Sequence, residues 1–384
     1  MTTVQTVVAA ADPVAQRAAG SAAVPPTQTS LETPVADRHT GHRLVVRDVI
    51  VETDDARSIV FEIPEEDRAA FEYEPGQFLT LRVELPDGGA VARCYSLSST
   101  PGLDDAPTVT VKRIADGRAS TWLCEQLAPG MALDVLPPSG HFVVRDATRD
   151  LLLFAGGSGI TPILSILRHA LHRTDVRVRL VYANRDERSV IFAGELRRLA
   201  ERFGDRLTVV HLLESVQGLP TAALLRGLTG GLDLTAMTSY ICGPTPFMAA
   251  VESTLHELGM THDHVVVEKF LSLSGDPFAP ETLVTVPVSG ETVPLEVELD
   301  GERHEFAWPA TVTLLDFLRG KGIDAPFSCK EGACSACSCR ILKGAVTMRN
   351  NQILEAEDLE EGWVLACQAD ADPDGGPISV TYDG

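Results

Sequence analysis

Four cysteines at a defined spacing constrain this chain more than any other feature of its sequence. Cys329, Cys334 and Cys337 follow the pattern C-x4-C-x2-C in the segment SCKEGACSACSCR, and Cys367 follows after 29 further residues. Three sulfurs so close together require the loop to wrap one side of a common centre. The segment that contains Cys367 must return to that centre, so the cysteines specify a domain folded around a metal-binding loop.

This spacing is that of a plant-type [2Fe-2S] cluster, in which four thiolates hold two irons. The small residues Gly332, Ala333, Ser335 and Ala336 let backbone N–H groups approach the sulfides. Structural zinc is the alternative, but it usually takes two separated C-x2-C pairs, and one such pair is present. Rieske ligation would need histidines, and none lies near either half of the motif.

The other cysteines need separate interpretations. Cys339 lies two positions past Cys337, where the chain enters an expected strand, and we interpret it as a packed residue rather than a ligand. Cys94, Cys124 and Cys242 stand alone. Because the chain shows no export signal, we expect a cytoplasmic protein whose cysteines stay reduced.

The length of 384 residues suits two or three domains. Short alternating segments such as HRLVVRDVIVE and TVTVKRI predict an antiparallel β-barrel, whereas apolar runs alternating with helical segments after residue 149 predict a parallel α/β sheet. Short strands return around the cysteine loop, and the resemblance of this part to plant-type ferredoxins implies an α+β domain of the β-grasp type. The expected boundaries are a disordered leader 1–40, the barrel 41–148, the α/β domain 149–271, a linker 272–282 and the iron–sulfur domain 283–384.

Charge and hydropathy exclude two classes of partner. The net charge of −22 argues against nucleic acid, and no stretch approaches the roughly 18 apolar residues that a membrane helix needs. Residues 281–384 hold 19 Asp and Glu against 7 Lys and Arg. This acidic domain suggests a basic docking face on a partner, although the charge could also serve only solubility.

The segment RCYSLSS, on an expected barrel strand, could bind a flat ring that carries a phosphate, although Arg and Tyr on a strand are usually surface and packing residues. An arginine, a tyrosine and a serine at 93, 95 and 96 can pair with a phosphate, stack on a flat ring and hydrogen-bond a ring nitrogen. The segment VKR follows at 111–113, and the turn GRAS at 117–120 leads into an expected helix. A helix N-terminus after a glycine turn is suited to bind phosphate.

The segment FAGGSGITP indicates a nucleotide site. Gly156, Gly157 and Gly159 let the backbone approach a pyrophosphate, and Pro162 suits a first helical position. The segment differs from G-x-G-x-x-G, and Ile160 stands where a G-x-S-x-G nucleophile elbow would need glycine.

The segment YANRDERSVIF should select the nucleotide. An acidic residue after the second strand favours the free ribose of NADH, so Asp186 predicts NADH. Arg185 and Arg188 could still bind the 2′-phosphate of NADPH.

These segments resemble the ferredoxin–NADP reductase superfamily over residues 42–271, and residues 283–384 resemble plant-type ferredoxins. The resemblance implies that Tyr95 stacks on the flavin, Ser96 lies near its N5 and Cys242 lies beside the nicotinamide. It implies FAD contacts at Arg93, Tyr95, Ser96, Val111, Lys112, Gly117, Ser120, Thr161 and Phe270. It implies nucleotide contacts at Gly157, Gly159, Thr161, Pro162, Arg185, Asp186, Cys242, Gly243 and Pro244, with Ser96 and Cys242 as the catalytic pair.

The domain order resembles the reductase components of multicomponent oxygenases. It implies an NAD(P)H-dependent oxidoreductase with FAD, or less favourably FMN, and one [2Fe-2S] cluster. We expect a monomer that passes electrons to a terminal oxygenase, a Rieske-type protein in the first instance and a di-iron oxygenase in the second. The alternative from another class is a redox sensor, which would not sustain turnover with an artificial acceptor.

Overall fold

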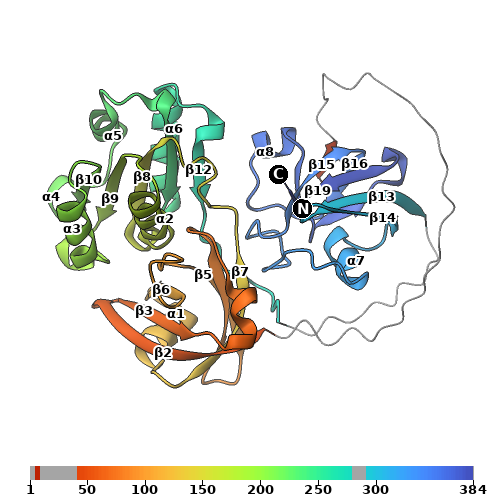
Figure 1. Cartoon of the computed structure of the whole chain (residues 1–384), viewed down its shortest axis with the longest axis horizontal. Helices are drawn as coiled ribbons and strands as arrows, with labels where there is room; N and C mark the ends of the chain where they lie inside the picture. Colours follow the sequence, from red (N-terminus) through yellow and green to blue (C-terminus); the bar gives the residue numbers. More distant parts are fainter. Residues whose placement is uncertain (1–4, 9–40, 279–290, 384) are drawn as a thin grey trace. The chain divides into compact units, whose positions relative to one another are not determined.

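The computed structural model describes residues 5–8, 41–278 and 291–383 (Figure 1). The chain divides into two compact units, Gly41–Pro277 and a second unit formed by Phe278–Gly384 with the N-terminal segment. Residues 1–4 and 9–40 of the expected leader and 279–282 of the expected linker lie outside the described residues. Among the described helices, none has the length and hydropathy needed to cross a bilayer.

The first unit begins with an antiparallel barrel. Its strands are β2 (His42–Thr53), β3 (Ala56–Glu62), β4 (Phe78–Glu84), β5 (Ala90–Ser96), β6 (Thr108–Lys112) and β7 (Ala132–Ser139), in the order β5-β4-β7-β2-β3-β6. A bridge between Leu97 and Val109 joins the chain just beyond β5 to β6, so the two ends of the sheet meet. The helix α1 (Arg118–Glu125) contributes Ala119 and Leu123 to the barrel core.

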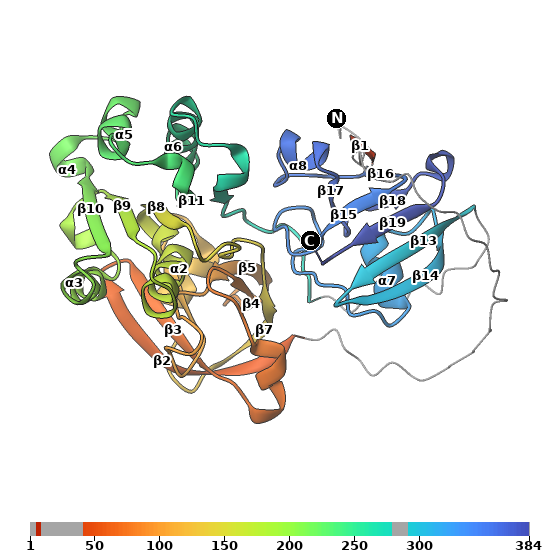
Figure 2. The same cartoon turned by 45° about the horizontal axis from the view of Figure 1, so that its top comes forward.

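The same unit contains a parallel sheet of β8 (Asp150–Gly156), β9 (Val178–Asn184), β10 (Leu207–Leu213), β11 (Met237–Cys242) and β12 (Val265–Glu268), in the order β10-β9-β8-β11-β12. One face packs on α2 (Ile160–Arg173) and α3 (Ala193–Arg202), and the other on α5 (Ala222–Thr229) and α6 (Thr245–Glu257) (Figure 2). The short helix α4 (Glu214–Gln217) follows β10. Helices on both faces explain why the central strands β8 and β11 are buried along almost their whole length.

The start of α2 differs from the sequence-based expectation. The glycines form a short 3-10 turn, η2 (Gly157–Gly159), and the helix begins at Ile160. Pro162 therefore occupies the third helical position rather than the first. Its missing N–H is tolerated there because the first turn of a helix has no intrahelical acceptor for it.

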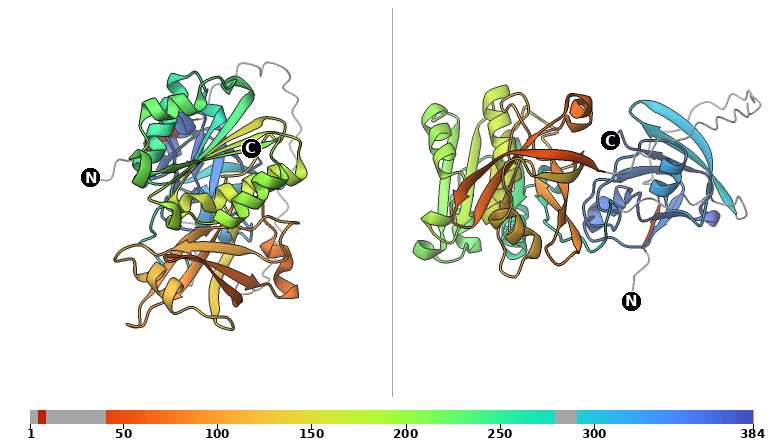
Figure 3. Two further views of the ribbon diagram at one scale, coloured as in Figure 1. Left: turned by 90° about the vertical axis from the view of Figure 1, so that its left-hand side faces the viewer. Right: turned by 90° about the horizontal axis from the view of Figure 1, so that it is seen from below.

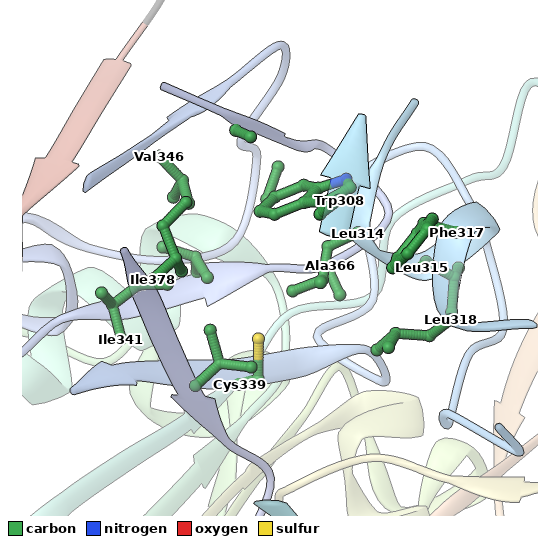
Figure 4. Packing of buried hydrophobic residues seen from close by; sticks show 14 of the residues in the cluster. Trp308, Leu314, Leu315, Phe317, Leu318, Cys339, Ile341, Val346, Ala366 and Ile378 are labelled. Atoms are coloured by element: carbon green, nitrogen blue, oxygen red, sulfur yellow. The ribbon is translucent and has the colours of Figure 1, made fainter. Parts of the chain in front are cut away.

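The second unit holds a five-stranded sheet of β14 (Glu302–Pro309), β13 (Thr292–Leu299), β19 (Ile378–Thr381), β15 (Ser338–Lys343) and β17 (Trp363–Leu365) in that spatial order. The helices α7 (Leu314–Gly320) and α8 (Ala356–Glu360) complete it. Its core surrounds Trp308 and includes the fully buried Cys339 (Figure 4). The expected multidomain fold class is confirmed.

A short N-terminal strand was not anticipated. β1 (Gln5–Val8) pairs antiparallel with β16 (Ala345–Met348), which in turn pairs with β18 (Ala369–Ala371) (Figure 3). Val7 is buried in the core of this unit. Residues 5–8 thus differ from the expected disordered leader. A run of four residues is too short to predict a strand from the sequence when the strand pairs with a distant segment.

Candidate functional site

Two glycine-containing segments meet where the parallel sheet reverses its strand order. The chain runs from β8 outward to β10 and then crosses to β11 on the other side of β8. In open α/β sheets, ligands bind outside the carboxyl ends of the strands at such a point. The segments GGSG and CGP lie at the carboxyl ends of β8 and β11, so the fold places them at this position.

The two segments are packed backbone against backbone. A Cβ added at Gly159 would lie 2.1 Å from the backbone oxygen of Cys242, and one added at Gly243 would lie 3.0 Å from the Cα of Gly156. Gly157 has a φ of +54°, and its carbonyl oxygen accepts a hydrogen bond of 2.9 Å from the Tyr182 hydroxyl. Glycine backbone at the N-terminus of α2 suits the close approach of a pyrophosphate.

Cys242 is fully buried and lies opposite Glu268 in the register of β11 and β12. Burial, with a smaller contribution from Glu268, raises the pKa of the Cys242 thiol, so the thiol is neutral near pH 7. Burial also raises the pKa of Glu268 from 4.5 to about 8. The site thus holds two protonated groups side by side, and the sequence analysis missed Glu268.

Replacing Glu268 by glutamine should flatten the pH dependence of stability. Between pH 4.5 and 8 the folded protein keeps a proton on Glu268 that the unfolded chain releases, so wild-type stability should fall as the pH rises through this range. From pH 5.5 to 7.5 we expect wild type to lose roughly 1–2 kcal/mol relative to Glu268→Gln. Urea unfolding monitored by flavin fluorescence at both pH values measures this difference. Parallel pH dependences for the two proteins would contradict it.

The expected flavin residues lie on β5 and the turn before α1. Tyr95 packs against the barrel core and Ser96 is buried. One guanidinium nitrogen of Arg93 donates hydrogen bonds of 2.6 Å to the carbonyl oxygen of Ala92 and 2.8 Å to that of Leu273. Arg93 therefore links β5 to the segment after β12, which also contains Phe270 with 46 % of its surface exposed.

The turn before α1 has the properties of a phosphate site. Gly117 is the N-cap of α1, and no side chain caps the first-turn N–H groups. The Ser120 hydroxyl accepts a hydrogen bond of 3.1 Å from the Ile114 N–H, and a Cβ at Gly117 would lie 2.5 Å from that hydroxyl oxygen. Uncapped N–H groups at a helix start fit the phosphate of a flavin nucleotide.

Three of the expected site residues are placed in ways that refine their roles. The Val111 side chain is buried in the barrel core, so a contact with FAD would involve its backbone. The Lys112 ammonium lies 4.0 Å from where a Cβ of Gly157 would be, beside the nucleotide turn. Thr161 is buried, and its hydroxyl donates to the Ser158 carbonyl oxygen over 3.0 Å.

The end of β9 holds the residues expected to select the nucleotide. The Asp186 carboxylate caps η3 (Glu187–Ser189) by accepting a hydrogen bond of 2.9 Å from the Ser189 N–H. Hydrogen bonding by the Ser189 side chain, and by its backbone N–H, lowers the pKa of Asp186. The side chain of Asn184 is buried, and within the described residues neither of its polar atoms has a hydrogen-bond partner. An amide left unsatisfied beside a nucleotide site is a candidate ligand contact that the sequence analysis did not single out.

The cysteine loop directs backbone N–H groups toward sulfur. The N–H groups of Glu331 and Ala333 donate to Cys329 Sγ over 3.4 and 3.3 Å, and Lys330 and Gly332 have φ values of 58° and 78°. Such alternation of conformation turns successive N–H groups inward. These N–H groups therefore approach a cysteine sulfur, and their approach to the sulfides of a cluster stays a prediction.

The four cysteines converge in a buried cage. Hydrogen bonds from the thiols of Cys334 and Cys367 lower the pKa of the Cys329 thiol, and Cys367 also lies within hydrogen-bonding reach of Cys337. Each of the four is at most 9 % exposed. The donor set and the surrounding N–H groups fit a [2Fe-2S] cluster, whereas Cys339 lies in the core of the sheet (Figure 4).

A barrel with a flavin-type strand, a sheet with a nicotinamide-type turn and an iron–sulfur cage define a flavin-dependent iron–sulfur reductase. Residues 43–144 match the oxidoreductase FAD-binding domain, residues 153–253 the oxidoreductase NAD-binding domain, and residues 297–372 the 2Fe-2S iron-sulfur cluster binding domain. The chain belongs to the family of ferredoxin reductase components of oxygenases, and it is an NAD(P)H-dependent oxidoreductase. Its domains support FAD, NADH and one [2Fe-2S] cluster as cofactors.

Particular relatives extend over almost the whole chain. It is 51 % identical over 343 residues to the ferredoxin reductase component of 3-ketosteroid-9-alpha-monooxygenase from Rhodococcus rhodochrous, covering 89 % of this chain and 97 % of the relative. It is 34 % identical over 350 residues to one of the subunits of 1,2-phenylacetyl-CoA epoxidase from Escherichia coli, covering 86 % and 95 %. The structure of phthalate dioxygenase reductase has the same fold, with a TM-score of 0.53 at 23 % identity over 89 % of this chain and 98 % of that one.

Within this family, the segment YANRDERSVIF favours a resemblance to the steroid-hydroxylase reductases over one to the epoxidase. The higher identity to the steroid-hydroxylase reductase confirms that prediction.

Proposed function

We propose that this chain delivers single electrons from NADH, through FAD and its [2Fe-2S] cluster, to the oxygenase of a 3-ketosteroid 9α-hydroxylase. The observation that carries the proposal is 51 % identity to the ferredoxin reductase component of 3-ketosteroid-9-alpha-monooxygenase from Rhodococcus rhodochrous, over 97 % of that protein's length. The cofactors supply hydride acceptance and one-electron transfer when bound. The chain's own part is to hold the nicotinamide beside the flavin, with Ser96 and Cys242 at the transfer site, and to shield the reaction from water.

The direction of transfer agrees with typical reduction potentials. Plant-type clusters lie near about −400 mV and Rieske centres at roughly −150 to +300 mV, so delivery to a Rieske oxygenase is downhill. We place the docking surface on the acidic iron–sulfur unit. The exposed Glu355, Glu357 and Glu360 at α8 precede the strand that leads to Cys367, so a basic partner would be drawn close to the cluster. We also propose that the protein is a monomer and that it acts in the cytoplasm.

Pairing with purified oxygenases tests the proposal. The reductase, NADH and a 3-ketosteroid 9α-hydroxylase oxygenase should give hydroxylated steroid at a rate at least tenfold above a mixture without reductase. The phenylacetyl-CoA epoxidase oxygenase is the matched control and should give little product. Failure with steroid and success with phenylacetyl-CoA would move the assignment to the epoxidase. Failure to sustain cytochrome c reduction would favour a redox sensor instead.

A further inference from the structure

An ion-pair cluster joins the β2–β3 turn of the barrel to the end of β9. One carboxylate oxygen of Asp55 lies 3.0 Å from a guanidinium nitrogen of Arg185 and 3.8 Å from the Lys112 ammonium. The other oxygen accepts a hydrogen bond of 2.8 Å from the Thr53 hydroxyl. The Asp55 side chain is 20 % exposed and that of Arg185 is 66 % exposed. The barrel therefore supplies a well-anchored negative charge to an otherwise exposed arginine.

The position of Arg185 gives this pair a consequence for nucleotide binding. Arg185 follows the last residue of β9, the strand end at which nucleotide-binding sheets distinguish a ribose hydroxyl from a 2′-phosphate. Binding of a 2′-phosphate is strongest when a guanidinium can direct two free N–H groups at it. A guanidinium that already pairs with a carboxylate has fewer N–H groups free to bind a phosphate. The carboxylate itself also repels the phosphate.

We propose that Asp55 sets the preference for NADH over NADPH by pairing with Arg185. The inference rests on the proposed function, because it concerns the same nucleotide site. Asp55 is a positioning residue that acts through Arg185. Asp186, which follows β9 of the nucleotide sheet, also favours NADH. Asp55 acts from the barrel, 130 residues before Arg185 in the chain.

The neighbouring Lys112 must be separated from this effect. Its ammonium lies beside the Gly157 turn, where it would interact with the pyrophosphate that both nucleotides share. Loss of the Asp55 charge would strengthen that interaction equally for NADH and NADPH. The effect on Arg185 is therefore measured by the ratio of kcat/KM for the two nucleotides, or by the ratio of affinities for two ligands that differ by the 2′-phosphate alone.

The test compares holoprotein variants by two ratios: the ratio of the affinities for 2′,5′-ADP and 5′-AMP, measured by titration calorimetry, and the ratio of kcat/KM for NADPH and NADH. Wild type should prefer NADH. Asp55→Asn should shift both ratios toward the phosphorylated ligand about three- to tenfold, the size expected of one partly exposed charge pair. The matched control, Asp105→Asn, removes an equal charge from the Arg47–Asp105 pair of the barrel, whose atoms are 3.0 Å apart, and should leave both ratios unchanged.

Variants of Arg185 provide a second test of the inference that does not depend on Asp55→Asn alone. Arg185→Gln in the wild-type background should change the ratios by less than about twofold, because the arginine is already neutralised. The double variant should match Arg185→Gln. An unchanged ratio in Asp55→Asn, a shift that persists without Arg185, or a large loss of NADPH use in Arg185→Gln alone would overturn the inference. If neither nucleotide reduces the flavin in wild type, the proposed function itself fails.

Discussion

Replacing Cys334 by serine should abolish electron delivery to the oxygenase while NADH still reduces the flavin. A serine hydroxyl is a poor substitute for a thiolate that holds iron, and Cys334 lies in the buried cage with Cys329. We expect at least a hundredfold loss of cytochrome c reduction and loss of the cluster's visible absorbance. Stopped-flow bleaching of the flavin by NADH should stay within about twofold of wild type, because the flavin and nucleotide sites belong to the other unit.

A matched control separates ligand loss from core damage. Cys339→Ala removes a fully buried sulfur from the same region of the chain without removing a proposed ligand. It should lower stability by about 1–2 kcal/mol through the small cavity and retain the cluster. Cluster loss in Cys339→Ala, or simultaneous loss of flavin reduction in Cys334→Ser, would contradict the modular scheme.

Replacing Gly159 by alanine should reduce NADH-dependent flavin reduction at least a hundredfold. Gly159 has a φ of −61°, which any residue can adopt, so the requirement for glycine is one of space. The added Cβ would lie 2.1 Å from the Cys242 carbonyl oxygen and 2.7 Å from the Gly243 nitrogen, and relief of this clash must move backbone that lines the nucleotide site. Stopped-flow absorbance measures the rate, and dithionite should still reduce the bound flavin.

Gly227→Ala is the control for this variant. Gly227 lies within α5, and a Cβ added there would meet nothing within 4 Å. Alanine in a helix is favoured over glycine by about 1 kcal/mol, so this variant should be as stable as wild type or more so, with unchanged flavin reduction. Near-normal reduction in Gly159→Ala would show that the two segments do not form the nucleotide site together.

Much of the fold could be predicted because its signals are local. Alternation along β2 and β4 and the apolar runs of β8 and β11 are read from a few consecutive residues, and they indicate a barrel and a parallel sheet. β1 escaped prediction because it is stabilised by pairing with β16 and by burial of Val7, both with residues far along the chain. Helix ends were also harder to predict, as α2 shows by beginning at Ile160 rather than at Pro162.

The sequence by itself determined the chemistry of the sites. The spacing of Cys329, Cys334 and Cys337, the motif around Tyr95 and the glycine turn each require particular residue types within one short segment. These requirements are covalent and local, so they are visible before folding. Tertiary structure alone decided which groups from distant segments stand beside them. Glu268 reaches Cys242 through the register of two parallel strands, and Asp55 reaches Arg185 because the barrel packs against the sheet. Burial and charge pairing arise only when the folded chain brings these groups together. They set the protonation of Cys242 and Glu268 and, in our proposal, the choice of nucleotide.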